Sequence, residues 1–339
     1  MIVQPNISII ISTYNYAQYI CQCIGSVLTC GSKELEVIVV DDGSTDDTAA
    51  RVKDLSESDK RIRYVYQDNT GVSAARNHGL DLARGKWVFF VDGDDVVDAE
   101  MIRMLIPEDS TIQIIGAMML ENDNGEVLRA NSFDHVQGYP EITFFKKSDW
   151  GILYATALLK SPCARAYNAE IIRRYNIRFD KRVAYGEDLL FNLEYLRHIS
   201  QIQLTTKPLY HYIKHGNSNS SSRYLNGIAA SIDIIAEAAQ SFCAHLGIGK
   251  DGFRQYCAED IMYLGLKAIS NEFLSEDKHG RYRRVSAIVR NTHFRDATRI
   301  TLRHSTVSGL LKILMRLGWP PAIYAFYWAA YHKIRSKQS

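Results

Sequence analysis

The chain has 339 residues, more than one hydrophobic core usually organises, so its length predicts two units. Forty Lys and Arg residues nearly balance 38 Asp and Glu residues, and the net charge of +2 argues against a protein that coats nucleic acid. The six cysteines form no Cys-x-x-Cys pair and have no histidine at zinc-binding spacing, which indicates free thiols in a reducing compartment. The start of the chain lacks a basic signal-peptide region, and no apolar run reaches the roughly 18 residues of a membrane span. We therefore expect a cytoplasmic protein.

The first hundred residues alternate between strand and helix patterns. β-branched runs at 7–12 and 36–40 predict strands, and the apolar spacing of residues 16–30 predicts the helix that connects them. Helices at 46–57 and 73–83 and strands at 61–66 and 86–91 continue the alternation. This pattern predicts an α/β fold with a mainly parallel central sheet, which binds ligands at the carboxyl ends of its strands.

The pattern changes twice beyond residue 110. Residues 110–160 predict further strands and loops, with a helix near 147–159. A stretch rich in Ser and Asn at 217–222 predicts a loop, and helical periodicity follows it to the end of the chain. We therefore expect an α/β domain at 1–222 and a helical C-terminal region at 223–339.

An acidic cluster follows the strand at 86–91. Its members are Asp92, Asp94, Asp95 and Asp98. Such close carboxylates repel one another unless a cation lies between them, and their oxygens suit Mg²⁺ or Mn²⁺ bridging a diphosphate. On residue types alone, an acidic turn that caps the next helix is the commoner arrangement. The roles of Asp42 and Arg76 are also undecided at this point. Asp42 is either part of an ordinary helix N-cap or a nucleotide contact, and Arg76 is either a surface arginine or a nucleotide contact.

Four motifs in sequence order resemble those of the family 2 glycosyltransferases with the GT-A fold. They are ISIIISTYN at 7–15, VVDDGSTD at 39–46, GVSAARN at 71–77 and VDGDD at 91–95. Three later segments are similar to bacterial enzymes that build surface polysaccharides such as capsule or O-antigen: SPCARAY at 161–167, YGEDLLF at 185–191 and YHYIKH at 210–215. Four ordered motifs on one strand–helix framework are more specific than any one of them.

The resemblance implies roles for individual residues. For the nucleotide sugar it implies contacts from Ser12, Thr13, Tyr14, Asp42, Arg76, Asp92, Asp94, Lys214 and Ser220. It implies Mn²⁺ or Mg²⁺ held by Asp94 and His215, with Asp95 in support. In the later motifs it implies Asp188 as the general base with Glu187 beside it, and Arg165 and Tyr185 as acceptor contacts. The chain departs from the family at Ser12, often Pro, at Cys163 and Arg165, usually Trp and Lys, and at Lys214, often Arg.

The resemblance therefore implies an inverting glycosyltransferase of the hexosyltransferase class. Its donor would be a UDP-sugar and its acceptor a hydroxyl of a glycan or lipid-linked glycan. Inversion needs one carboxylate to take the acceptor proton, and it needs the charge of the departing diphosphate stabilised.

Two rival functions explain parts of the same pattern. A nucleotidyl or phosphoryl transferase would share the nucleotide-binding sheet and the acidic metal site, but it leaves Glu187 and Asp188 without a task. A catalytically silent nucleotide- or glycan-binding scaffold, which docks other assembly enzymes, would need no base.

The C-terminal tail, about residues 305–335, is basic and aromatic. From residue 297 to the end there are seven Lys and Arg residues and no Asp or Glu. Two Pro and several Trp and Tyr residues interrupt an amphipathic pattern, which favours a helix pair lying on an anionic membrane, at the inner face of the cell membrane. A helical packing surface or a homo-oligomer contact uses the same apolar spacing and stays open.

Overall fold

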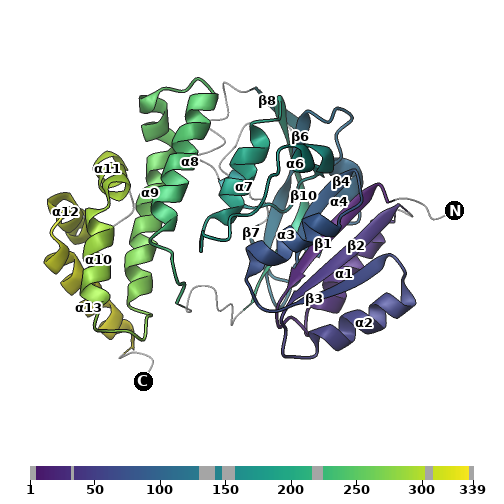
Figure 1. The fold of residues 1–339 in the computed structure, drawn as a ribbon, viewed down its shortest axis with the longest axis horizontal. Helices are drawn as coiled ribbons and strands as arrows, with labels where there is room; N and C mark the ends of the chain where they lie inside the picture. The colour runs from purple at the N-terminus through teal and green to yellow at the C-terminus, as the bar shows by residue number, and fades with distance from the viewer. Residues whose placement is uncertain are drawn as a thin grey trace. The chain divides into compact units, whose positions relative to one another are not determined.

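The computed structural model describes residues 5–31, 34–129, 142–146, 157–215, 224–301 and 308–335. The chain forms two compact units (Figure 1). The first contains Met1–Lys181 and Glu187–Ser218, and the second contains Arg182–Gly186 and Asn219–Ser339. The division falls shortly before the boundary predicted after residue 222. The short segment 182–186, which we had placed in the first unit, belongs to the second.

The main sheet of the first unit is parallel except at one edge. Its strands follow the order β3-β2-β1-β4-β9, in which β9 alone is antiparallel to its neighbour. Their bounds are β1 Ile7–Thr13, β2 Leu35–Asp42, β3 Ile62–Gln67, β4 Trp87–Asp92 and β9 Tyr167–Asn168. The predicted α/β class and mainly parallel sheet are therefore confirmed.

Helices cover both faces of this sheet. They are α1 Ile20–Thr29, α2 Thr48–Ser58 and α3 Val72–Leu82. Successive strand side chains point to opposite faces, so Ile9 and Ile11 pack in the core with α1 and α2. Ile10 points the other way and touches α3, where Gly79 leaves room for its side chain. Hydrophobic burial on both faces fixes the strand register and therefore the height at which the strand ends meet.

A second sheet in the first unit follows the order β5-β10-β6-β7, with β8 also paired to β10. The strands are β5 Val96–Val97, β6 Ile112–Asn122, β7 Val127–Arg129, β8 Ile142–Lys146 and β10 Gln201–Lys214. Pro208 lies where the register between β10 and β6 shifts, as expected for a residue without an N–H to donate. Pairing of Tyr210 with Val97 brings the end of β10 beside the acidic loop that follows β4.

Four further short elements lie among the described residues of the first unit. They are α4 Met101–Leu105, the 3₁₀ turn η3 Ala157–Lys160, α6 Ala169–Arg174 and α7 Glu187–Leu196. The helix predicted near 147–159 falls mostly outside the described residues, and only its last positions enter η3.

The second unit is helical, as predicted. Its helices are α8 Ser231–His245, α9 Lys250–Glu272, α10 Arg281–Arg290, α11 Thr292–Thr301, α12 Gly309–Leu317 and α13 Pro320–Arg335. The long helix α9 packs against α8, α10 and α11. Gly265 of α9 permits a close approach to α11, because a Cβ there would lie 2.1 Å from the ring of Phe294. None of the helices within the described ranges is long and apolar enough to cross a membrane.

Candidate active site

Polar side chains gather at the carboxyl ends of the parallel strands in the first unit. Ser12 pairs in register with Asp92 on one side and with Val40 on the other, so β1, β2 and β4 end at the same edge. The loops after β1 and β2 are tied together, because Asn15 N–H donates to Ser44 Oγ and Thr45 N–H donates to Asn15 Oδ1. The sequence placed the candidate residues after strands, and the sheet brings them together.

Arg76 connects two carboxylates that are far apart in the sequence. Its Nη1 donates to Asp188 Oδ1 over 2.6 Å, and its Nη2 donates to Asp92 Oδ1 over 2.8 Å. The side chain is only 4% exposed, and its guanidinium carbon lies 5.3 Å from the ring centroid of Phe179. Burial lowers the pKa of Arg76, but Asp188 and Asp92 more than offset this and hold it well above its usual value. The arginine is therefore a fixed cation between the acidic loop and the start of α7.

Asp188 and Glu187 form the first turn of α7. Burial raises the pKa of Asp188 to about 7, while the Arg76 guanidinium opposes the rise and the charges of Glu187 and Asp92 add to it. A carboxylate with a pKa near neutral pH is suited to accept a proton, because it is largely ionised yet basic enough to hold one. The side chain of Asp188 is 21% exposed and so remains within reach of a ligand.

Asp95 connects the acidic loop to β10. It is 1% exposed, and its carboxylate accepts hydrogen bonds from Tyr210 Oη at 2.6 Å and from Ile213 N at 2.9 Å. The same Tyr210 oxygen accepts a hydrogen bond from Asp92 N at 3.1 Å. The strand β10 thereby fixes the backbone that carries Asp92 and Asp94.

Gly93 allows the acidic loop to lie against β1. A Cβ at this position would sit 3.0 Å from Cβ and Oγ1 of Thr13 and 3.1 Å from Ser12 O. The Gly93 N–H donates to Ser12 O over 3.1 Å. This contact explains why Thr13 is buried beneath the loop and only 2% exposed.

Asp94 and His215 lie together, as the predicted metal site requires. Asp94 Oδ2 is 3.7 Å from His215 Nε2, and the imidazole stacks on Tyr19 with 3.8 Å between ring centroids. Its Nδ1 contacts the carboxylate of Asp123, an arrangement that orients the ring. Burial and Asp92 raise the pKa of Asp94 to about 6, although Tyr16 and His215 oppose the rise.

The donor atoms fit Mn²⁺ or Mg²⁺ in kind, since both cations accept carboxylate oxygen and Mn²⁺ also accepts imidazole nitrogen. In the described part of the chain, no three His, Cys, Asp or Glu side chains converge as a metal cluster. The pair Asp94 and His215 would supply two ligands and leave the remaining coordination positions for phosphate oxygens and water.

The carboxylate of Asp42 forms hydrogen bonds within the protein. Its two oxygens accept hydrogen bonds from Gln67 Nε2, Thr70 N and Gly71 N, at 2.8 to 2.9 Å. Asp42 therefore holds the loop that leads into α3, the helix that carries Arg76. Beside it, Ser12 is 7% exposed, whereas Tyr14 is 38% exposed.

The remaining predicted residues differ in where they lie. Lys214 ends β10 with an exposed side chain, and Ser220 lies outside the described residues. Arg165 is 1% exposed in the core, a position that does not fit the acceptor contact expected of it. Tyr185 belongs to the second unit, where its ring lies 3.6 Å from the ammonium of Lys267.

Four residues with clear positions at the site were missed in the sequence: Tyr16, Tyr19, Asp123 and Tyr210. Tyr16 hydrogen-bonds to Asp94, and the other three orient His215 or Asp95. Only Tyr210 stood inside a recognised motif. The others act through contacts between separate loops, for which a single sequence carries no signal.

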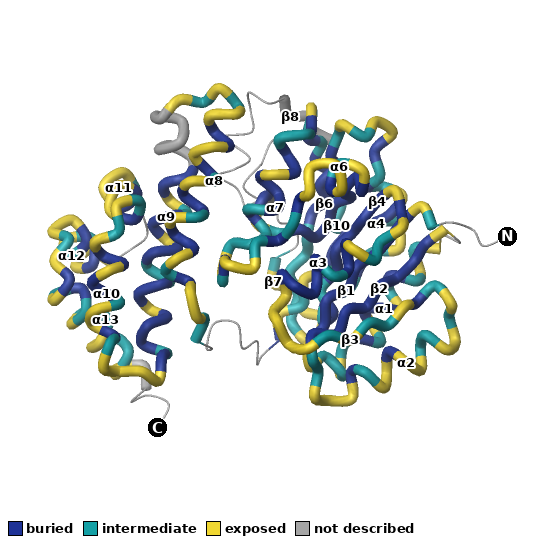
Figure 2. The backbone as a smooth tube through the Cα atoms, viewed as in Figure 1, coloured by how far each residue is buried: buried dark blue, intermediate teal, exposed yellow. Residues whose placement is uncertain are grey.

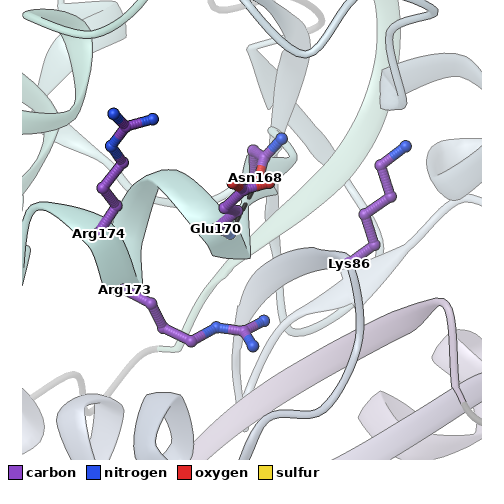
Figure 3. Close-up of a pocket in the computed structure, with 5 residues that line it drawn as sticks. All are labelled: Lys86, Asn168, Glu170, Arg173 and Arg174. Carbon is purple, nitrogen blue, oxygen red and sulfur yellow. Dashed lines mark hydrogen bonds between the residues drawn. The ribbon is translucent and has the colours of Figure 1, made fainter.

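A cavity of about 730 Å³ lies at the opposite end of β4. Figure 3 shows the residues that line it, which are Lys86, Asn168, Glu170, Arg173 and Arg174. Lys86 precedes β4 and Asn168 pairs with Trp87 at its first position. The cavity contains none of the predicted site residues.

The chain is similar to known glycosyltransferases. Residues 8–175 match glycosyl transferase family 2. The uncharacterized glycosyltransferase EpsJ of Bacillus subtilis is 30% identical over 265 residues, which cover 76% of this chain and 74% of EpsJ. The succinoglycan biosynthesis protein ExoO of Rhizobium meliloti is 28% identical over 258 residues, which cover 74% of this chain and 71% of ExoO.

Among solved structures, residues 1–349 of TarS from S. aureus, crystallised with UDP-GlcNAc, superpose with a TM-score of 0.65. The alignment covers 97% of this chain and 92% of that one at 19% identity, which shows a shared GT-A fold. Together with the identity to EpsJ and the matched family region, this places the chain in glycosyl transferase family 2, and it is a glycosyltransferase of that family.

Proposed function

We propose that this protein is an inverting, metal-assisted glycosyltransferase that moves a sugar from a UDP-sugar to a hydroxyl of a glycan or lipid-linked glycan. The observation that carries the proposal is the Arg76 bridge, because it joins the loop of Asp92 and Asp94 to Asp188 through one buried guanidinium. The UDP-sugar rests on the fold shared with TarS, whose crystal structure contains UDP-GlcNAc. A role in bacterial surface polysaccharide synthesis rests on the likeness to ExoO.

Each carboxylate has a separate task in this mechanism. Asp188 takes the proton from the acceptor hydroxyl while the acceptor oxygen bonds to the anomeric carbon. The bond from that carbon to the nucleotide diphosphate breaks on the opposite face, so the configuration inverts. Glu187 raises the basicity of Asp188 by its charge, and Arg76 keeps the carboxylate in place.

On the donor side, Asp94 and His215 would hold the cation. The hydrogen bond between Asp95 and Tyr210 fixes the loop that carries Asp94. The bound Mn²⁺ or Mg²⁺ would neutralise charge that develops on the departing diphosphate. Exposed Lys214 at the end of β10 offers a second positive charge for the same purpose.

The test is turnover of UDP-sugars by the purified protein in the presence of Mn²⁺, measured as UDP release. Asp188→Asn is expected to lower kcat by about 10²- to 10⁴-fold, the usual contribution of a general base, while UDP still raises the melting temperature. Asp94→Ala is expected to abolish the Mn²⁺-dependent part of that stabilisation. Asp54→Asn, an exposed carboxylate on α2, serves as the matched control.

The rivals give different results in the same assay. Release of a sugar phosphate in place of UDP, undiminished in Asp188→Asn, would favour a nucleotidyl or phosphoryl transferase, which has no use for this base. Binding of UDP without turnover of any nucleotide sugar would favour a silent scaffold.

A further inference from the structure

One side of α12 exposes a row of large apolar side chains. Leu310 and Ile313 are each 58% exposed and Leu317 is 67% exposed. Their spacings of three and four residues place them on the same side of the helix. Trp319, also 58% exposed, follows Gly318, the residue that caps the end of the helix. We call these four residues the α12 apolar face, and Figure 2 shows the exposed stretches of α12.

The rest of α12 fixes how this face is presented. Leu311 and Met315, on the other side of the helix, are 8% and 7% exposed and anchor it to the second unit. Ser308 caps the start of the helix through Leu311 N. Gly318 ends it in the left-handed conformation, with φ of 57°. Because α12 is held by its own packing, its apolar face is a fixed feature of the unit.

The charged side chains of α12 and of the rest of the C-terminal tail are all basic. Lys312 and Arg316 lie one turn apart on α12 and border the apolar face. Residues 297–339 contain seven Lys and Arg and no Asp or Glu. A partner that covers the face should therefore be apolar at its centre and negatively charged around it, which describes the surface of an anionic bilayer.

The neighbouring helix α13 exposes less aromatic surface than its sequence predicted. Phe273 packs against Tyr324, Tyr327 and Tyr331, with ring centroids 5.4 to 6.2 Å apart. Most of the aromatic side of α13 is thus used inside the second unit, although Trp328 remains 50% exposed. The membrane-facing helix pair predicted from the sequence is reduced to one helix.

We propose that the α12 apolar face inserts into the headgroup region of an anionic membrane, with Lys312 and Arg316 against lipid phosphates. The alternative occupant is a second copy of the chain. The charge argues against it, because a symmetric contact brings each patch of cations close to its twin and no acidic residue of the tail is available to compensate. This inference concerns location and does not depend on the proposed transfer reaction.

The experiment uses the full chain and sedimentation with lipid vesicles. Vesicles of phosphatidylcholine are compared with vesicles that also contain phosphatidylglycerol. We expect binding to the anionic vesicles that weakens as salt rises, and weak or no binding to the neutral ones. Failure to bind the anionic vesicles would overturn the proposal.

Two sets of variants locate the contact. Replacing Leu310, Ile313 and Leu317 together by Gln, a good helix former, should lower the partition coefficient about tenfold or more. The matched control, Val127→Thr with Leu128→Thr, removes exposed apolar side chains from β7 of the first unit and should stay within about twofold of the original. Equal losses in both sets, or none in the triple variant, would refute an α12 contact.

Two further measurements decide the remaining outcomes. Sedimentation velocity without lipid should show a monomer. If the protein is instead a dimer that does not bind vesicles, and the triple variant is a monomer, the α12 apolar face is the contact with a second copy. Should the triple variant fail to fold by circular dichroism, Trp319→Ser replaces it, because Trp319 follows the helix and its loss leaves the packed side intact. Unchanged vesicle binding in a folded Trp319→Ser protein would then count against the proposal.

Discussion

The pKa of Asp188 depends on a few neighbouring charges. The groups that face it are Arg76, Glu187 and Asp92, and burial outweighs the arginine to raise its pKa to about 7. A base must be deprotonated to act, and kcat/KM reports the pKa of the free enzyme, so kcat/KM should be level above this pH and fall about tenfold for each pH unit below it.

Glu187→Gln provides the internal check on that pH profile. Removing a neighbouring negative charge lowers the pKa of Asp188, so the acidic limb of the profile should move to lower pH. Asp54→Asn should leave the limb in place. A kcat/KM that stays constant from acidic to alkaline pH would show that Asp188 is not the proton acceptor.

Tyr210 holds the acidic loop in place, a role that was not predicted from its motif. Its hydroxyl donates to the buried carboxylate of Asp95 and accepts from Asp92 N–H. Tyr210→Phe leaves both groups without this partner and should lower the free energy of unfolding by about 1–3 kcal/mol. Tyr212→Phe, two residues along β10 on a ring that is 45% exposed, should change stability little. Denaturant titrations of both variants measure the difference, and equal stabilities would show that the Tyr210 hydroxyl is dispensable.

At the scale of elements, the second unit depends on the close contact of α9 with α11. Gly265→Ala should gain about 1 kcal/mol of helix propensity. It should lose about 1–3 kcal/mol from overpacking, because the new Cβ meets the Phe294 ring at 2.1 Å. We expect net destabilisation, measured as a lower melting temperature.

Gly25→Ala is the paired control. Gly25 lies inside α1, where a Cβ would meet no atom within 4 Å, so only the propensity gain remains and the protein should become slightly more stable. Stabilisation by both substitutions would show that Phe294 moves aside without cost.

For the molecule as a whole, the chain divides into two compact units. A ligand stabilises the unit that binds it, by about 2.7 kcal/mol at one hundred times its Kd. Addition of UDP and Mn²⁺ should therefore raise the unfolding transition of the first unit and leave that of the second in place. Differential scanning calorimetry tests this, and a single transition that moves as a whole would mean that the units unfold together.

Local features of this protein could be predicted from the order of its residues. β-branched runs and helical periodicity located β1 to β4 and α1 to α3 within a few residues, because side-chain spacing reflects which face is buried. The ordered motifs identified the family, and the rule that parallel sheets bind ligands at strand ends predicted that Asp92 and Asp94 lie at the edge of the sheet where the candidate site is. The helical second unit was predicted from the same periodicity.

Contacts between groups far apart in the chain became visible only in the folded protein. The bridge from Arg76 to Asp188 spans 112 residues and the contact of Tyr210 with Asp95 spans 115, and no local pattern encodes such pairs. Burial also separated residues that look alike in sequence, since Arg165 is enclosed in the core and Leu310 of α12 is exposed. Side-chain type and spacing are local properties, whereas burial and charge pairing depend on how the elements pack.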